Sequence, residues 1–243
     1  MKNNQQSKIK ITIVYDNNAY NPELTTAWGF ACIIEMPEQT ILFDTGEDGR
    51  ILLENMGKMG ITPQKIDMVF LSHIHSDHTG GLIDLLKQNS KISVYYPHSF
   101  PEVFEQQITA LGAKAKKVDL PQEIAPNIFT TGEMGGLIKE QSLVIKTNKG
   151  LLIITGCSHP GIVKIINQAK KITQAKPYLV IGGFHLRDAS TVELNAIIND
   201  FKLAGVRKVG PAHCSGQQAG ALFKKAFGNN YIPAGAGTEI NIY

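Results

Sequence analysis

One short segment, residues 71–81 (LSHIHSDHTGG), constrains the fold and the chemistry of this chain more than any other. It follows an apolar run, Ile66–Leu71, which predicts a buried strand. It precedes Leu82, Leu85 and Leu86, whose spacing predicts the apolar face of a helix. Three imidazoles and one carboxylate therefore lie on a turn between a strand and a helix, where a rigid scaffold can direct several side chains at one point.

The four polar side chains of this segment, His73, His75, Asp77 and His78, predict a metal site. So many ligand groups close together are best stabilised by a bound cation, and imidazole combined with carboxylate suits zinc, iron or manganese. The alternative is a chance histidine cluster on a solvated loop, which we consider the weaker interpretation.

Length and composition favour a soluble enzyme. The 243 residues are 43% hydrophobic and 19% charged, a size that suits one large α/β core of up to about 250 residues. No apolar run approaches the roughly 20 residues of a membrane helix. The net charge of +3 is too small to indicate a nucleic-acid-binding protein. Because the start of the chain lacks the apolar segment of a secretory signal, and the cysteines number three, we expect reduced thiols and a cytoplasmic protein.

Strand and helix patterns alternate along the chain after an opening hairpin, and this order repeats once. The repeat predicts two sheets packed face to face, with helices outside each. We expect residues 1–8 to form a disordered tail and residues 9–243 to form a single domain of two similar halves. Strands are expected at residues 9–15, 29–34, 40–43, 66–71, 92–96, 142–147, 151–155, 178–181, 208–210 and 239–243, with short strand-like runs around residue 118 and at 128–129. Helices are expected at residues 48–59 and 101–112, and in four further segments that begin near residues 82, 162, 191 and 217.

Several predicted strands end in the same way, at a turn that contains glycine or proline and a metal-ligand type of side chain. In an α/β sandwich, strand ends of one direction gather at one edge, where sites are commonly built. We therefore expect one metal centre to collect these residues from across the chain. They are Asp44, the residues His73–His78, Cys157, His159, His185 and His213.

The pattern His73-x-His75-x-Asp77-His78 after a strand, with Asp44 before it and His213 far downstream, resembles the metallo-β-lactamase-fold hydrolases. The segments TGCSHPGI (155–162), GGFHL (182–186) and AHCSG (212–216) are similar to the branch of 7,8-dihydropterin-6-methyl-4-(β-D-ribofuranosyl)aminobenzene-5′-phosphate synthase-like proteins. The resemblance covers nearly the whole chain. It implies a four-layer αβ/βα sandwich with two mixed sheets, helices on the outer faces, and up to two metal ions at the edge between the sheets.

The same resemblance implies a ligand set. His73 and His75 would bind the first ion, whereas Asp77, His78 and His213 would bind the second. Asp44 would orient ligands through hydrogen bonds.

Two positions depart from the pattern of the family. The loop at residues 132–141 lacks the histidine with which many members complete the first ion site; His159 is the obvious replacement and Glu140 a weaker one. The usual bridging aspartate is replaced by Cys157, which is either a thiolate ligand for zinc or iron or a small buried residue beside a single tightly bound ion. We expect Zn²⁺, as one or two ions, with Mn²⁺ and iron as alternatives.

Four further residues carry weaker signals. His185 suits the pocket, either as a ligand or as a residue that contacts the substrate or a ligand. His98 reads as a surface residue and Cys32 as a core residue. Cys214 follows His213 directly, so we expect it to point away from the site into packing.

The predicted activity is hydrolysis by a metal-bound hydroxide, because a cation can lower the pKa of bound water from 15.7 to about 7. Asp77 would hold this water and take its proton. A small phosphorylated or ester/lactone molecule is the expected substrate, with no nucleic-acid or membrane partner; the pattern says nothing about oligomeric state. The alternatives are a phosphodiesterase or nuclease of the same fold, and a non-hydrolytic iron-containing redox or ligand-binding protein.

Overall fold

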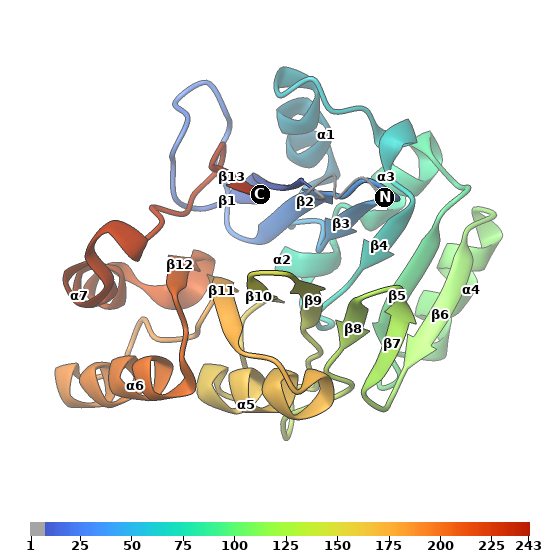
Figure 1. The fold of residues 1–243 in the computed structure, drawn as a ribbon. Coiled ribbons are helices and arrows are strands. Elements are labelled where there is room, and N and C mark those ends of the chain that lie inside the picture. Colours follow the sequence, from blue (N-terminus) through green and yellow to red (C-terminus); the bar gives the residue numbers. More distant parts are fainter. Residues whose placement is uncertain (1–7) are drawn as a thin grey trace, which may run out of the picture.

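The computed structural model describes residues 8–243, in which two mixed β-sheets face each other (Figure 1). The first sheet has the strand order β13-β1-β2-β3-β4-β5-β6 and the second the order β12-β11-β10-β9-β8-β7. The strands are β1 (Ile9–Asp16), β2 (Phe30–Glu35), β3 (Thr40–Phe43), β4 (Met68–Phe70), β5 (Ser93–Pro97), β6 (Lys114–Val118), β7 (Gln122–Ala125), β8 (Ile128–Thr130), β9 (Leu143–Thr147), β10 (Gly150–Thr155), β11 (Pro177–Gly183), β12 (Lys208–Ala212) and β13 (Glu239–Ile242).

Helices cover the outer face of each sheet (Figure 1). Helices α1, α3 and α4 pack on the first sheet, and α5, α6 and α7 pack on the second. The short helix α2 lies between the sheets at the centre of the view. The helices are α1 (Gly49–Lys58), α2 (Ser76–Thr79), α3 (Leu82–Gln88), α4 (Glu102–Ala110), α5 (Ile162–Thr173), α6 (Thr191–Ala204) and α7 (Gln217–Phe227).

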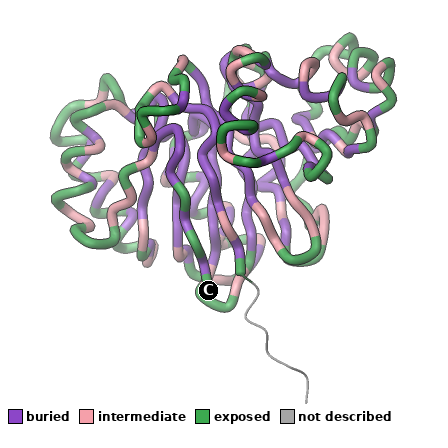
Figure 2. The backbone as a smooth tube through the Cα atoms, turned by 90° about the horizontal axis from the view of Figure 1, so that it is seen from above, coloured by how far each residue is buried: buried purple, intermediate pink, exposed green. Residues whose placement is uncertain are grey.

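Three separate apolar cores join the four layers. Side chains alternate between the two faces of a strand, so Cys32 and Phe43 face the opposite sheet while Ile33 and Leu42 face the helices, and all four are fully buried. Figure 2 shows the buried strands in the middle and the exposed residues concentrated in the outer segments. The predicted four-layer αβ/βα sandwich is confirmed, as is the placement of Cys32 in the core.

Most predicted elements are present with boundaries shifted by a few residues. Helix α1 begins after Asp48, whose carboxylate accepts the N–H groups of Arg50 and Ile51, and this is a standard way to satisfy a helix N-terminus. Strand β7 was not predicted, because its residues QEIA are half-exposed and show no apolar alternation. The predicted tail, residues 1–8, lies outside the described residues except for Lys8, which is exposed. Within residues 8–243, no helix is long and apolar enough to cross a membrane.

Candidate metal centre

The carboxyl ends of five strands meet around α2 at one edge between the sheets (Figure 1). Strand β3 pairs in parallel with β4, β10 with β11, and β11 with β12, so the strands within each of these two groups end on the same side of their sheet. Each end carries at least one of the polar side chains that the sequence singled out. They are Asp44 after β3, His73 after β4, Cys157 and His159 after β10, His185 after β11 and His213 after β12.

The structure brings the seven predicted metal ligands into two adjoining groups. The first cluster contains His73, His75 and His159, and the second contains Asp77, His78, Cys157 and His213. Within each cluster the potential ligand atoms all lie within 4.8 Å of one another. The rings of His73 and His78 have their centroids 4.2 Å apart, so the two clusters are neighbours.

The donor set fits divalent metal ions. The Nε2 atom of His159 is buried without a hydrogen-bond partner, which costs free energy unless something binds it. Imidazole, carboxylate and thiol together are the ligand types of zinc and iron sites. Metal binding by these residues remains a prediction.

Asp44 belongs to neither cluster, but it orients two of the histidines, His73 and His78, through hydrogen bonds. Its carboxylate accepts the backbone N–H of Ser72 at 2.7 Å and the hydroxyl of Ser72 at 2.7 Å, and it bonds Nδ1 of His78 at 2.7 Å. Ser72 Oγ in turn lies 2.9 Å from Nδ1 of His73. These contacts leave Nε2 of both rings free to face the clusters, an arrangement that suits the orienting role expected of Asp44. Position 156 requires glycine, because the Cβ of any other residue would collide with the Ser72 hydroxyl.

His213 is held by the end of β1, a contact that the sequence did not indicate. The Nδ1 atom of His213 lies 2.8 Å from Oδ1 of Asn17, and the backbone N–H of His213 donates to Asp16 at 3.1 Å. Asn17 also donates to the carbonyl of His213. This pairing spans nearly 200 residues, so local sequence patterns carry no trace of it.

Glu140 supports the turn after β10, a role that the sequence did not indicate. Its fully buried carboxylate accepts the backbone N–H groups of Cys157, Ser158 and His159, at 3.0, 2.8 and 2.7 Å. Burial raises the pKa of Glu140 to about 7, against the hydrogen bonds, which lower it. Because both oxygens are engaged in this way, Glu140 does not stand in for the missing histidine; it fixes the turn that carries Cys157 and His159.

Charge in the second cluster is shared between Asp77 and two imidazoles. Burial opposes ionisation of Asp77, but hydrogen bonds from His213 and His78 hold its pKa well below the usual range. Its Oδ2 lies 3.2 Å from Nε2 of His213 and 3.4 Å from Nε2 of His78. Burial alone would lower the pKa of His78, but the carboxylates of Asp44 and Asp77 raise it to about 10. In the first cluster, burial lowers the pKa of His73 and takes that of His159 to about 4, which favours neutral imidazoles.

The prediction that Cys214 points away from the site is wrong. Its sulfur lies beside Cys157 and His185, and all three potential ligand atoms lie within 4.8 Å of one another. The cause is the tight turn His213–Ser215, in which His213 has a left-handed φ of 47° and the chain does not continue the alternation of β12. A hydrogen bond from the Cys157 thiol lowers the pKa of Cys214, whereas burial opposes this shift. His185 is exposed, and His98 is exposed as predicted.

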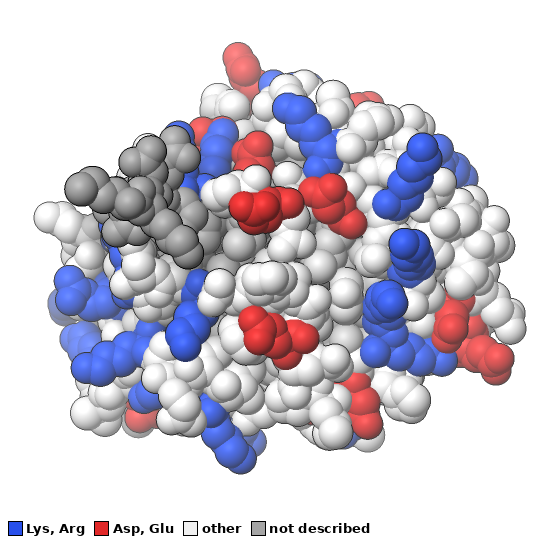
Figure 3. All heavy atoms as spheres, turned by 45° about the vertical axis from the view of Figure 1, so that its right-hand side comes forward, with Lys and Arg blue, Asp and Glu red and all other residues white. Residues whose placement is uncertain are grey.

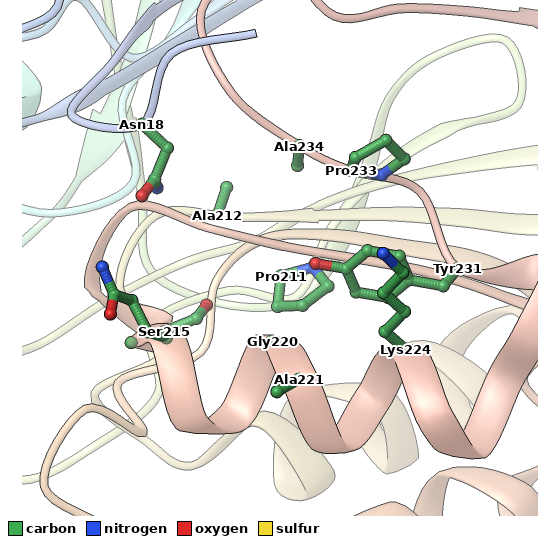
Figure 4. A pocket seen from close by; sticks show the side chains of 12 residues that line it. Asn18, Pro211, Ala212, Ser215, Gly220, Ala221, Lys224, Tyr231, Pro233 and Ala234 are labelled. Atoms are coloured by element: carbon green, nitrogen blue, oxygen red, sulfur yellow. The ribbon is translucent and has the colours of Figure 1, made fainter.

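A cavity of about 360 Å³ adjoins the second cluster. The indole of Trp28 lies 4.7 Å from the ring of His213 and the guanidinium of Arg187 lies 5.8 Å from the indole. The cavity is lined by Trp28, His185, Arg187, Asp188, Ala189, Glu193 and Cys214. A second cavity of about 270 Å³, along α7 (Figure 4), is lined by residues such as Pro211 and Tyr231 and by none of the cluster residues. The first cavity is therefore the better substrate site.

Sequence comparison places this chain among known proteins of the same fold. The family model of the Metallo-beta-lactamase superfamily matches residues 29–165. A protein of Methanocaldococcus jannaschii named 7,8-dihydropterin-6-methyl-4-(beta-D-ribofuranosyl)-aminobenzene-5'-phosphate synthase is 34% identical over 282 aligned positions, which cover 96% of this chain and 96% of that protein.

Solved structures share the fold. The crystal structure of Tm1679, a metal-dependent hydrolase of the beta-lactamase superfamily, is similar with a TM-score of 0.80 at 28% identity, covering 96% of this chain and 99% of the other. The short form of human tRNase Z has a TM-score of 0.65 at 15% identity, covering 95% and 98% of the two chains, and this likeness concerns the fold alone. The sequence match and the architecture together establish that this chain belongs to the metallo-beta-lactamase superfamily.

Proposed function

We propose that this protein is a metal-dependent hydrolase of a small ester, lactone or phosphorylated substrate. The observation that carries the proposal is the pair of adjoining ligand clusters beside an open cavity. The first cluster would hold one ion through His73, His75 and His159. The second would hold another through Asp77, His78, Cys157 and His213.

Zinc is the ion that these donors favour. Three imidazoles suit zinc, and a thiol ligand favours zinc or iron over manganese. When bound, the ions supply Lewis acidity, which polarises a substrate oxygen and acidifies a water molecule.

Asp77 is the proposed catalytic residue of the chain. Its depressed pKa keeps the carboxylate ionised at neutral pH, so it can orient a water molecule by accepting its hydrogen bond. It would take up the proton only from a water molecule that a bound ion has made more acidic. The contacts from His213 and His78 hold this carboxylate within the second cluster. Trp28 and Arg187 would hold the substrate in the cavity, the indole against an apolar or planar group and the guanidinium against an anionic one.

The substrate class follows from the cavity and the surface. The cavity is small, and the net charge of +3 is low for a protein that binds a polynucleotide. In Figure 3 the basic side chains on the right of the visible face have acidic side chains at the centre and lower right beside them. The name of the archaeal relative supports a phosphorylated small molecule. The alignment of 282 positions is longer than this chain of 243 residues, so the relative carries insertions and we do not extend its product to this protein.

The test combines metal content with a substrate panel. The purified protein should contain zinc, and it should hydrolyse at least one member of a panel of lactones, thioesters, phosphomonoesters and phosphodiesters. Asp77→Asn should lower kcat by about 10²–10⁴-fold while the fold, followed by circular dichroism, is retained. Coloured iron with no hydrolysis would favour a redox protein, and cleavage of polynucleotides alone would favour a nuclease. Full activity in a metal-stripped sample would refute the proposal.

A further inference from the structure

A third group of potential ligands lies beside the two clusters. Cys157, His185 and Cys214 place two sulfurs and one imidazole nitrogen within 4.8 Å of one another. Cys157 also belongs to the second cluster, where its sulfur lies 3.3 Å from Nε2 of His78. This group is therefore joined to the second cluster through one sulfur atom.

Three neighbouring strands build the group. Cys157 follows β10, His185 follows β11 and Cys214 follows β12, and these strands are parallel and adjacent. Gly183 makes the close approach possible, because a Cβ at this position would lie 2.7 Å from the Cys214 sulfur. The Cys214 sulfur also lies 3.7 Å from the carbonyl oxygen of Cys157. The hydrogen-bonded strands therefore place the two thiols and the imidazole next to one another.

We propose that Cys157, Cys214 and His185 form a third metal position that takes a soft divalent cation, with the Cys157 sulfur bridging to the second cluster. Zinc binds thiolate at about 2.3 Å and imidazole at about 2.0–2.1 Å, and three donors within 4.8 Å of one another can reach these distances with small side-chain rotations. Cys214 and His185 also line the cavity of Trp28 and Arg187. An ion held by these residues would therefore lie beside the cavity that we assign to substrate.

The three groups should differ in their choice of metal. Two sulfurs and one nitrogen select zinc or cadmium, whereas manganese prefers oxygen ligands and gains little from thiols. Cadmium should therefore fill one more position than manganese. This difference belongs to the third position, because the first cluster offers imidazoles to either metal, and the second offers imidazoles and the Asp77 carboxylate besides the shared Cys157 sulfur.

The experiment measures bound metal directly. Metal-free protein, kept reduced with a phosphine, is dialysed against Cd²⁺ or Mn²⁺, and bound metal per chain is determined by mass spectrometry together with the ultraviolet absorption of cadmium–thiolate bonds. Two variants remove the third position: Cys214→Ser and His185→Asn. Asparagine tolerates the left-handed φ of 54° at position 185, and His185 is exposed, so this variant should fold even where Cys214→Ser does not. Cys32→Ala is the matched control, since Cys32 is the remaining cysteine and lies in the core between the sheets.

Wild type and Cys32→Ala should bind one more cadmium per chain than Cys214→Ser and His185→Asn, and all four proteins should bind the same amount of manganese. The cadmium–thiolate absorption should fall to about half in Cys214→Ser, because one of two ligating sulfurs is lost. Equal cadmium binding in wild type and His185→Asn would overturn the third position. That result would leave the proposed hydrolase intact, whereas wild-type protein that binds no metal would contradict the hydrolase proposal itself.

Discussion

Replacing Glu140 by glutamine tests how far the site depends on a residue that touches no metal ligand side chain. The carboxylate accepts three backbone N–H groups, from Cys157, Ser158 and His159. Glutamine has the same shape but only one acceptor oxygen. If that oxygen keeps the bonds to Cys157 and Ser158, the amide N–H₂ must face the N–H of His159, so two donors oppose each other.

The cost can be worked from these contacts. A hydrogen bond to a charged group contributes about 1.5–3 kcal/mol, and a neutral one about 0.5–1.5 kcal/mol. Glu140→Gln loses one charged bond and weakens two, and it is partly compensated because a charge is no longer buried. We expect the free energy of unfolding to fall by about 2–4 kcal/mol. Because the turn that carries Cys157 and His159 loosens, zinc affinity should fall by about 10–100-fold.

Urea unfolding at pH 8, above the Glu140 pKa of about 7, measures the first quantity, and competition with a chromophoric chelator measures the second. The midpoint of unfolding should shift at constant m-value. Glu54→Gln, on the exposed face of α1, is the matched control and should change stability by no more than about 0.5 kcal/mol. If Glu140→Gln matches Glu54→Gln in both stability and zinc affinity, the assigned role of Glu140 is wrong.

Three further predictions follow from the same geometry. Trp28→Ala should raise KM about 3–10-fold with little change in kcat, because it removes a stacking surface beside His213 and not a ligand; a drop in kcat alone would contradict this. In metal-free protein the raised pKa of His78, about 10, stabilises the fold fully below about pH 6.5, and this contribution should be lost as the pH rises through 10; Asp44→Asn should flatten that part of the urea-unfolding profile, and an unchanged profile would count against the pair. Chelation should lower the free energy of unfolding by about 2.7 kcal/mol relative to protein at 100 times the metal Kd, and zinc should restore it; identical unfolding curves with and without chelator would speak against bound metal.

The sequence predicts the fold and the centre of the site well because both rest on local patterns. Apolar runs marked the buried strands, and Asp48 marked the start of α1. Four of the candidate ligands, His73, His75, Asp77 and His78, lie within six residues of sequence. The end of β4 and the single turn of α2 bring their side chains together, so the local sequence pattern alone locates this part of the site.

The supporting contacts could not be predicted, because they join segments that are distant in the chain. Asn17 meets His213 across nearly 200 residues, and Glu140 meets the turn at Cys157 through backbone N–H groups that leave no residue signature. The orientation of the Cys214 side chain was also predicted wrongly, because the local pattern does not reveal where strand β12 ends. Alternation along β12 would turn its side chain away from that of His213, but the left-handed residue at His213 ends the alternation.

Left-handed backbone is concentrated where the ligands are. Asp44, Ser158, His185 and His213 have φ of 52°, 66°, 54° and 47°, and such conformations are costly for residues other than glycine. Three of the four are held by buried hydrogen bonds that do not involve metal: Asp44 bonds Ser72, Ser158 donates to the carbonyl of Gly183, and the N–H of His213 donates to Asp16. Strain persists only where the surroundings impose it, so the fold itself holds His213 and the two supporting residues Asp44 and Ser158 in place. We therefore expect a metal-free chain to keep the same arrangement of strand ends.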